Sequence, residues 1–255
     1  MTNIDRHGRV ALSGPVAPGR STAMTHKDWM SAAELEYRRL LEMFAGLTAD
    51  DWHRPTDCDE WDVREVLAHL VGGALSTSSL RELRRLQKLG REFRPGVDGM
   101  NDVEVLERAK LTPDRLLTDL ATAAERGVRA RRRIPAAIRA LRVPFGPPLG
   151  VRSVGYLMDR VYTRDAWMHR VDITRATSRP MVLTPEHDGR LVADVVREWA
   201  RDHGKPFELT LTGPAGGHFS KGTGGQRLTL DAVQFCRILS GRAMGDGLLD
   251  RQLPF

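Results

Sequence analysis

Cysteine and lysine are scarce in this chain, and both scarcities narrow the class of protein. Only Cys58 and Cys236 occur, with no CxxC pair, so we expect neither a disulfide framework nor a cysteine metal site. The basic residues are 34 arginines against five lysines. Although the net charge is +6, that bias is more typical of a GC-rich genome than of a nucleic-acid surface, so we expect no nucleic-acid partner.

Long apolar runs are also missing. No stretch approaches the ~20 apolar residues of a membrane span, and the first 25 residues lack the apolar run of a secretory signal. We therefore expect a soluble, cytoplasmic protein with no membrane partner. Residues 1–25 mix Gly, Pro, Arg and Ser without periodicity, which predicts a flexible tail, and Met24 is an alternative start.

Apolar residues at helical spacing dominate the next part of the chain. The helices that this spacing predicts are Asp28–Leu47, a second one after the loop Trp52–Trp61 with a break near Ser76–Ser79, a third region within Asn101–Arg133, and Val154–Ala176. In the third region Thr112 and Pro113 read as an N-cap and a first helical residue. Four helical regions predict a bundle.

The pattern changes after Pro180. A helix capped by Thr184 and ended by Gly204 is expected, followed by the alternating segments FELTLTG and QRLTLDA and a last helix near Ala232–Arg242. The glycine-rich stretch Gly213–Gly225 lacks GxxxxGK[ST], which favours a β-hairpin connection over a phosphate loop. We therefore expect a mainly α protein with a tail at 1–25, a helical bundle at 26–177 and a small α+β domain at 178–255.

Two acidic residues interrupt the apolar stripe of the helix predicted at 154–176. On a helical wheel the stripe contains Asp165 and Asp172, with His169 at its edge, one turn after Asp165. A buried carboxylate without a partner is costly. Asp165 is therefore expected to pair with a cation or bind a metal, since Asp and His at i and i+4 can chelate one ion. The apolar members of the stripe are Val154, Leu157, Met158, Val161 and Met168.

His69 is the third candidate ligand, beside the apolar face of the second predicted helix. Gly72 and Gly73 remove side-chain bulk next to it, which suits a cavity near a metal and is otherwise unfavourable in a helix. The pattern leaves two interpretations open, a metal ligand and a surface histidine.

Further carboxylates leave alternatives open. Asp172 could orient His169, cap a helix end or pair with an arginine. Glu65, one turn before His69, could orient that histidine or be a solvated surface carboxylate.

Aromatic, thiol and basic residues are expected to have structural roles. Trp61 and Trp167 are expected as core or loop anchors rather than substrate stackers, and Cys58 as structural rather than nucleophilic. The basic run Arg129–Arg142 lacks interleaved aromatics and is expected to form a solvated face.

Two segments carry a resemblance to a known family. WHRPTDCDEWDVREVLAHLVGG, residues 52–73, resembles the N-terminal signature of the mycothiol-dependent maleylpyruvate isomerase family, a branch of the DinB-like superfamily. RDAWMHRVDI, residues 164–173, is similar to the later motif of that family, in which an acid and a histidine four residues apart precede an Asp-Ile pair.

This resemblance implies a DinB-like four-helix bundle followed by a small α+β C-terminal domain. It implies a divalent ion, usually zinc, held by His69, Asp165 and His169, with Asp165 standing where the family more usually has glutamate. It also implies mycothiol as thiol cosubstrate and a substrate carboxylate held by Arg242 of the Leu239–Arg242 motif LSGR.

The leading hypothesis is a metal-dependent enzyme that uses mycothiol for isomerisation or S-transfer on a small carboxylated or electrophilic substrate. The alternative is a noncatalytic metal- or hydrophobic-ligand-binding protein on the same bundle, and a weaker one is a basic regulatory protein that contacts nucleic acid. The sequence gives no oligomeric state.

Overall fold

The computed structural model describes residues 23–146 and 149–255, so residues 1–22 of the predicted tail lie outside the described residues. The chain divides into two compact units. A helical unit comprises Thr25–Pro180 and the last two residues, Pro254–Phe255, and a C-terminal unit comprises Met181–Leu253 together with residues 23–24.

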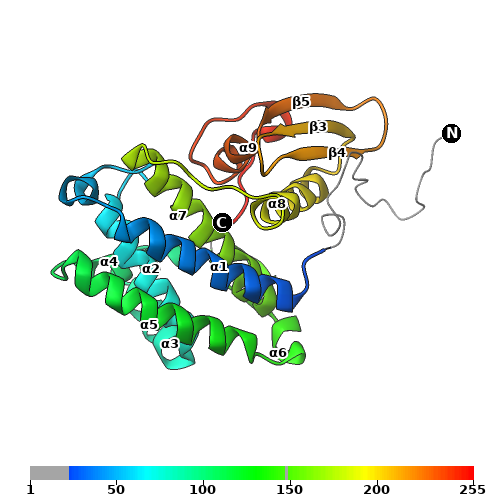
Figure 1. Cartoon of the computed structure of the whole chain (residues 1–255). Helices are drawn as coiled ribbons and strands as arrows, with labels where there is room; N and C mark the ends of the chain where they lie inside the picture. The colour runs from blue at the N-terminus through cyan, green and yellow to red at the C-terminus, as the bar shows by residue number, and fades with distance from the viewer. Residues whose placement is uncertain (1–22, 147–148) are drawn as a thin grey trace. The chain divides into compact units, whose positions relative to one another are not determined.

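The helical unit contains seven α-helices among its described residues (Figure 1). They are α1 (His26–Ala45), α2 (Val63–Ser78), α3 (Leu80–Gly90), α4 (Val97–Leu106), α5 (Pro113–Arg132), α6 (Ala136–Ala140) and α7 (Tyr162–Thr177). The unit also holds the 3-10 helix η1 (Ala49–His53), the π-helical segment η2 (Tyr156–Val161) and a two-stranded antiparallel sheet of β1 (Arg142–Pro144) and β2 (Val151–Ser153).

Four of these helices form the predicted bundle. Helix α5 packs against both α1 and α2, and α7 packs against the same two, which closes a ring of α1, α5, α2 and α7. Each helix contributes a fully buried side chain to one apolar cluster, namely Leu40, Leu67, Leu120 and Ile173. Burial of each such residue contributes about 1.5–3 kcal/mol, so the mainly α fold class is confirmed and has a clear energetic basis. No helix of the described chain is long and apolar enough to span a membrane.

Local caps set the helix ends. Thr25 and Asp28 form a reciprocal capping box that starts α1 two residues before the predicted start. Ser79 ends α2 and caps α3, which is the predicted break. Thr112 accepts a hydrogen bond from Arg115 N at 3.4 Å at the start of α5, as the Thr-Pro pair indicated.

The helix predicted over 154–176 is helical throughout, but its winding changes. Val154 and Gly155 are α-helical, Tyr156–Val161 form the π-helical η2, and the α-helix α7 begins at Tyr162. A single apolar stripe is therefore wrong, because a π-turn shifts the angular register of everything before it. Leu157, Met158 and Val161 pack with Leu149 in a separate small cluster, while α7 contributes Ile173 to the main core.

The C-terminal unit packs two helices on a three-stranded sheet (Figure 1). Its elements are α8 (Asp188–His203), β3 (Phe207–Thr212), β4 (Gly217–Lys221), β5 (Gln226–Asp231), α9 (Ala232–Leu239) and the 3-10 turn η3 (Gly247–Leu249). Alternate residues of β3 are buried, as its sequence predicted. The Trp199 ring of α8 lies 4.7 Å from Phe207 of β3 and 5.5 Å from Phe235 of α9, which joins the three elements.

The glycine-rich stretch differs from its prediction. It contains β4, which pairs antiparallel with β3, whereas β5 pairs parallel with β3 in the order β4-β3-β5. Glycine-rich turns on both sides obscured the short strand Gly217–Lys221, so a simple hairpin between the two alternating segments is wrong.

Both helices of the C-terminal unit have one end that differs from the predicted residue. Helix α8 begins at Asp188, whose Oδ2 accepts a hydrogen bond from Thr184 N at 2.7 Å, rather than directly after Thr184. It ends at Gly204 with φ +68°, as predicted. Helix α9 ends at Leu239, short of Arg242, because Gly241 takes a φ of +81°.

Candidate metal centre

His69 lies in the middle of α2. A reciprocal capping box forms the start of this helix. Asp62 Oδ1 accepts from Glu65 N at 2.8 Å, and Glu65 Oε2 accepts from Asp62 N at 2.9 Å. Glu65 is half-buried and caps the helix. Its predicted role in orienting His69 is wrong, because the two ring nitrogens of His69 lie against Glu104 and Asp165. His69 itself is 5% exposed, which excludes the surface-histidine interpretation.

Asp165 and His169 project from consecutive turns of α7. His169 is 2% exposed, and the Asp165 side chain keeps 26% of its surface accessible. The three candidate ligands meet: His69 Nε2 lies 3.4 Å from Asp165 Oδ2, and His169 Nε2 lies 3.3 Å from Asp165 Oδ1. One ligand atom from each residue lies within 4.8 Å of the others, an arrangement that could hold a metal ion.

A carboxylate that the sequence reasoning missed stands behind His69. Glu104 of α4 is 2% exposed, and its Oε2 lies 2.8 Å from His69 Nδ1. Among the described residues neither of these two atoms makes a hydrogen bond elsewhere. A Cβ on Gly72 would fall 2.4 Å from Glu104 Cγ, so this glycine makes the room that Glu104 fills. The predicted cavity beside His69 was the only sequence signal for Glu104.

His169 has a matching partner. Asp172 is fully buried, and its Oδ2 lies 2.9 Å from His169 Nδ1. This contact agrees with one of the alternatives left open for Asp172, orientation of His169. Both imidazoles therefore turn Nδ1 to a carboxylate and Nε2 to Asp165, so that a metal ion bound at Nε2 would leave the Nδ1–H of each ring to its carboxylate.

The local electrostatics favour a cation at this point. Burial alone would lower the pKa of His69, but the carboxylates of Asp165 and Glu104 outweigh it and raise the pKa to about 10. Burial alone would raise the pKa of Asp165, yet the two imidazoles hold it far below its usual range. Burial raises the pKa of Glu104 although His69 opposes the shift.

Trp61 forms one wall of the cluster. Its ring centroid lies 4.8 Å from that of His69 at an interplanar angle of 31°, and 6.1 Å from that of His169. The loop residue Trp61 thus shields both imidazoles, a role that the sequence did not indicate. Trp167 is 1% exposed and is a core residue, as predicted.

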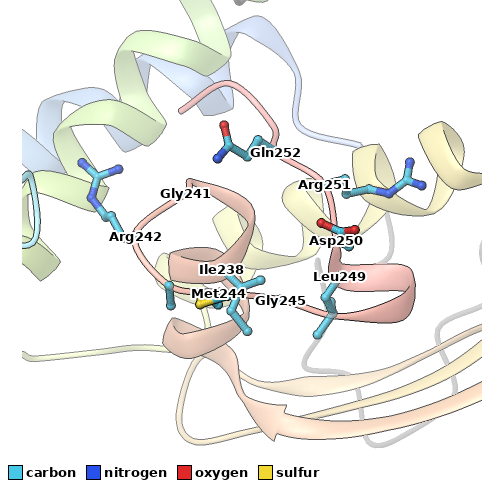
Figure 2. Close-up of a pocket in the computed structure, with 10 residues that line it drawn as sticks. Ile238, Gly241, Arg242, Met244, Gly245, Leu249, Asp250, Arg251 and Gln252 are labelled. Carbon is cyan, nitrogen blue, oxygen red and sulfur yellow. The ribbon is translucent and has the colours of Figure 1, made fainter.

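Arg242 lies in the turn after α9 in the C-terminal unit. Its backbone N donates to Arg237 O at 2.9 Å. The residue lines a pocket of about 570 Å³ that also contains Met244, Asp250 and Arg251, and Figure 2 shows its side chain extending away from the turn. The pocket thus presents two arginines and one carboxylate.

The remaining predicted residues are placed as follows. Cys58 is half-buried in a turn where its N donates to Thr56 Oγ1 at 3.1 Å, which fits a structural role. In the basic run, Arg129, Arg132 and Arg142 are exposed as expected. Arg131 is different, because it is completely buried.

Comparison with known proteins gives one family. The sequence model described as "Mycothiol maleylpyruvate isomerase N-terminal domain" matches residues 33–174, more than half of the chain. No curated protein matches the chain significantly.

Two solved structures share the fold. One is a crystal structure of the mycothiol-dependent maleylpyruvate isomerase, with 15% identity and a TM-score of 0.57 over 87% of this chain and 92% of that one. The other is a mutant of the mycothiol-dependent maleylpyruvate isomerase with one histidine changed to alanine, with 16% identity and the same TM-score and coverage. At this level of identity the likeness establishes a common fold.

Proposed function

The chain belongs to the mycothiol maleylpyruvate isomerase family, and we propose from this premise that it is a metal-dependent enzyme using a low-molecular-weight thiol. The thiol is mycothiol, and the reaction is isomerisation or S-transfer on a small carboxylated or electrophilic substrate. The cosubstrate and the reaction class come from the family, whereas the metal rests on the residues of this chain.

The observation that carries the metal site is the convergence of His69, Asp165 and His169. Two imidazole nitrogens and a carboxylate oxygen form a donor set that suits zinc and neighbouring divalent metals. The cluster gathers three carboxylates around two imidazoles when Glu104 and Asp172 are included, so a dication would balance much of the negative charge collected there.

The chain's own residues would divide the work. Glu104 and Asp172 hold the imidazoles by Nδ1, which would leave Nε2 of each ring to bind the ion. Trp61 excludes water from one side of the imidazole pair. Arg242 would hold a substrate carboxylate by charge-assisted hydrogen bonds.

A divalent ion in this centre would supply stabilisation of the thiolate at neutral pH, since a free thiol has a pKa near ~8.5. Asp165 is the ligand with accessible surface, so the thiol would approach from its side.

Metal content by elemental analysis tests the site. We expect near-stoichiometric metal in the wild type after reconstitution and none in His169→Ala, because two ligands bind a divalent ion poorly. His53→Ala is the matched control, since His53 lies in the same unit with a side chain 77% exposed. Metal retained in His169→Ala, or absent from both proteins, would refute the metal centre.

Turnover then tests the reaction class. Metal-loaded protein is assayed with mycothiol and maleylpyruvate, and with electrophilic acceptors for S-transfer. Metal binding without any thiol-dependent turnover would favour the noncatalytic binding protein instead.

A further inference from the structure

Arg131 is a buried cation that the proposed reaction does not use. It lies in the last turn of α5 with 0% of its surface exposed. Its Nη2 donates to Thr163 Oγ1 at 2.8 Å, and its guanidinium carbon lies 5.9 Å from the centroid of the Tyr162 ring. Within the described residues, Nε and Nη1 make no hydrogen bond.

No carboxylate neutralises this guanidinium. Among the described residues, no ion pair within 4.0 Å involves Arg131. Asp159 acts on it only through space, because its oxygens contact His26 Nδ1 at 2.9 Å and Arg139 Nη1 at 3.5 Å. Burying an unpaired charge costs several kcal/mol, so the fold carries a penalty that a bound anion would remove.

Another buried arginine of the same unit is neutralised by a buried carboxylate, which is the usual arrangement for a buried charge. Arg170 of α7 donates through Nε and Nη2 to the two oxygens of Glu36, at 2.8 and 2.9 Å, and Glu36 is fully buried. The helical unit also buries Arg108 and Arg164. Arg170 and Arg131 give the clearest contrast, because of these two only Arg170 has a carboxylate of the chain against its guanidinium.

The unpaired guanidinium contacts α7 at Thr163, two residues before the candidate metal ligand Asp165. Thr163 and Tyr162 open α7 in the turn before Asp165. Burial raises the pKa of Tyr37 to about 12, with Arg131 acting against the shift and Asp165 adding to it. The charges of Arg131 and Asp165 therefore both act on the Tyr37 phenol.

We propose that Arg131 binds the carboxylate of a small molecule inside the helical unit. A single buried cation calls for a single negative charge, and a planar carboxylate matches the donors of a guanidinium. Thr163 and the face of Tyr162 fix the guanidinium plane. The inference rests on the proposed function only where this small molecule is identified as the substrate.

Carboxylate binding is tested on metal-free, full-length protein with sodium formate and sodium acetate as probes. We expect formate at ten times its dissociation constant to raise the Tm of the wild type by about 3–5 °C. Arg131→Met should show no formate-dependent shift. Its Tm without formate should equal or exceed that of the wild type, because the substitution removes an uncompensated buried charge. Arg170→Met is the matched control and should lower Tm, since it leaves Glu36 unpaired.

Three results would overturn the proposal that Arg131 binds a carboxylate. Absence of any formate or acetate shift in the wild type overturns the proposal without reference to a variant. An equal shift in Arg131→Met, or a loss of Tm in Arg131→Met as large as in Arg170→Met, overturns it too, because the guanidinium would then be structural. The readout needs neither metal nor turnover, so its failure is distinguishable from failure of the proposed function.

Discussion

At the scale of single residues, the candidate metal centre depends on the carboxylate that contacts Nδ1 of each imidazole. His69 and His169 contact Asp165 through Nε2, and both have a buried carboxylate at Nδ1. Such partners fix the ring orientation, and their loss typically lowers metal affinity by about 10–100-fold. Glu104 is the partner most open to a clean test, because a glycine rather than its own side chain can be changed.

We predict that Gly72→Ala weakens metal binding about 10–100-fold. The new Cβ would lie 2.4 Å from Glu104 Cγ, so Glu104 must withdraw from His69. Gly73→Ala is the control, since its Cβ would meet only the Tyr162 ring at 3.8 Å, an ordinary contact. Competition with a chromophoric chelator measures both dissociation constants.

Equal metal affinity in the two alanine variants would contradict the role of Glu104. Glu104→Gln, which keeps the volume and removes the charge, should reproduce the loss seen in Gly72→Ala. Thermal unfolding of each metal-free variant separates loss of affinity from loss of fold.

The sequence predicted only part of this centre, for a physical reason. Asp165, His169 and Asp172 follow from i, i+3 and i+4 neighbourhood on one helix. Glu104 could not be predicted in this way, because its contact with His69 depends on how α4 packs against α2, which no periodicity encodes. Arg131 was hidden for the same reason, since a run of arginines looks solvated until its helix is packed.

At the scale of elements, helix ends were predicted correctly where the sequence contains a clear capping residue. Thr112 and Gly204 mark helix ends at the predicted residues. The register of the segment before α7 could not be predicted, because a wheel of 3.6 residues per turn assumes an unbroken α-helix and η2 is π-helical. Parallel pairing of β3 with β5 was also beyond a reading of neighbouring segments, because β4 intervenes in the chain.

The 3-10 helix η1 is tied to the end of α7 by one carboxylate. Asp51 Oδ2 accepts from Thr48 N at 2.9 Å and from Arg179 Nη2 at 2.7 Å, and its side chain is 5% exposed. The Thr48 backbone hydrogen bond and the Arg179 guanidinium lower the pKa of Asp51 to about 2.

We predict that Asp51→Asn destabilises the protein at neutral pH and loses this effect in acid. A carboxylate with a depressed pKa in the folded state stabilises the fold above its unfolded pKa, and that contribution disappears as pH falls toward 2. Urea unfolding of the wild type and the variant between pH 7 and pH 2 measures the difference. The exposed Asp50→Asn is the control, and a gap that stayed constant with pH would contradict the assignment.

At the scale of the whole molecule, many of the arginines form ion pairs with carboxylates of the chain. Arg94 bonds both Glu60 and Asp102, and Arg85 bonds Glu82, all within the helical unit. Exposed pairs of this kind stabilise little, but they cancel positive charge locally.

Arg242 and the candidate metal ligands are far apart in the chain, so their proposed roles are separable by mutation. We predict that Arg242→Ala keeps its metal and lowers kcat/KM about 10- to 150-fold, the loss expected when charge-assisted hydrogen bonds to a carboxylate are removed. Arg251→Ala is the control, because Arg251 lines the same pocket but lies outside the LSGR motif. Steady-state assays with mycothiol and elemental analysis are run on the same preparations. Loss of metal in Arg242→Ala, or equal losses of kcat/KM in the two variants, would mean that Arg242 supports the fold or the general charge of the pocket rather than the substrate.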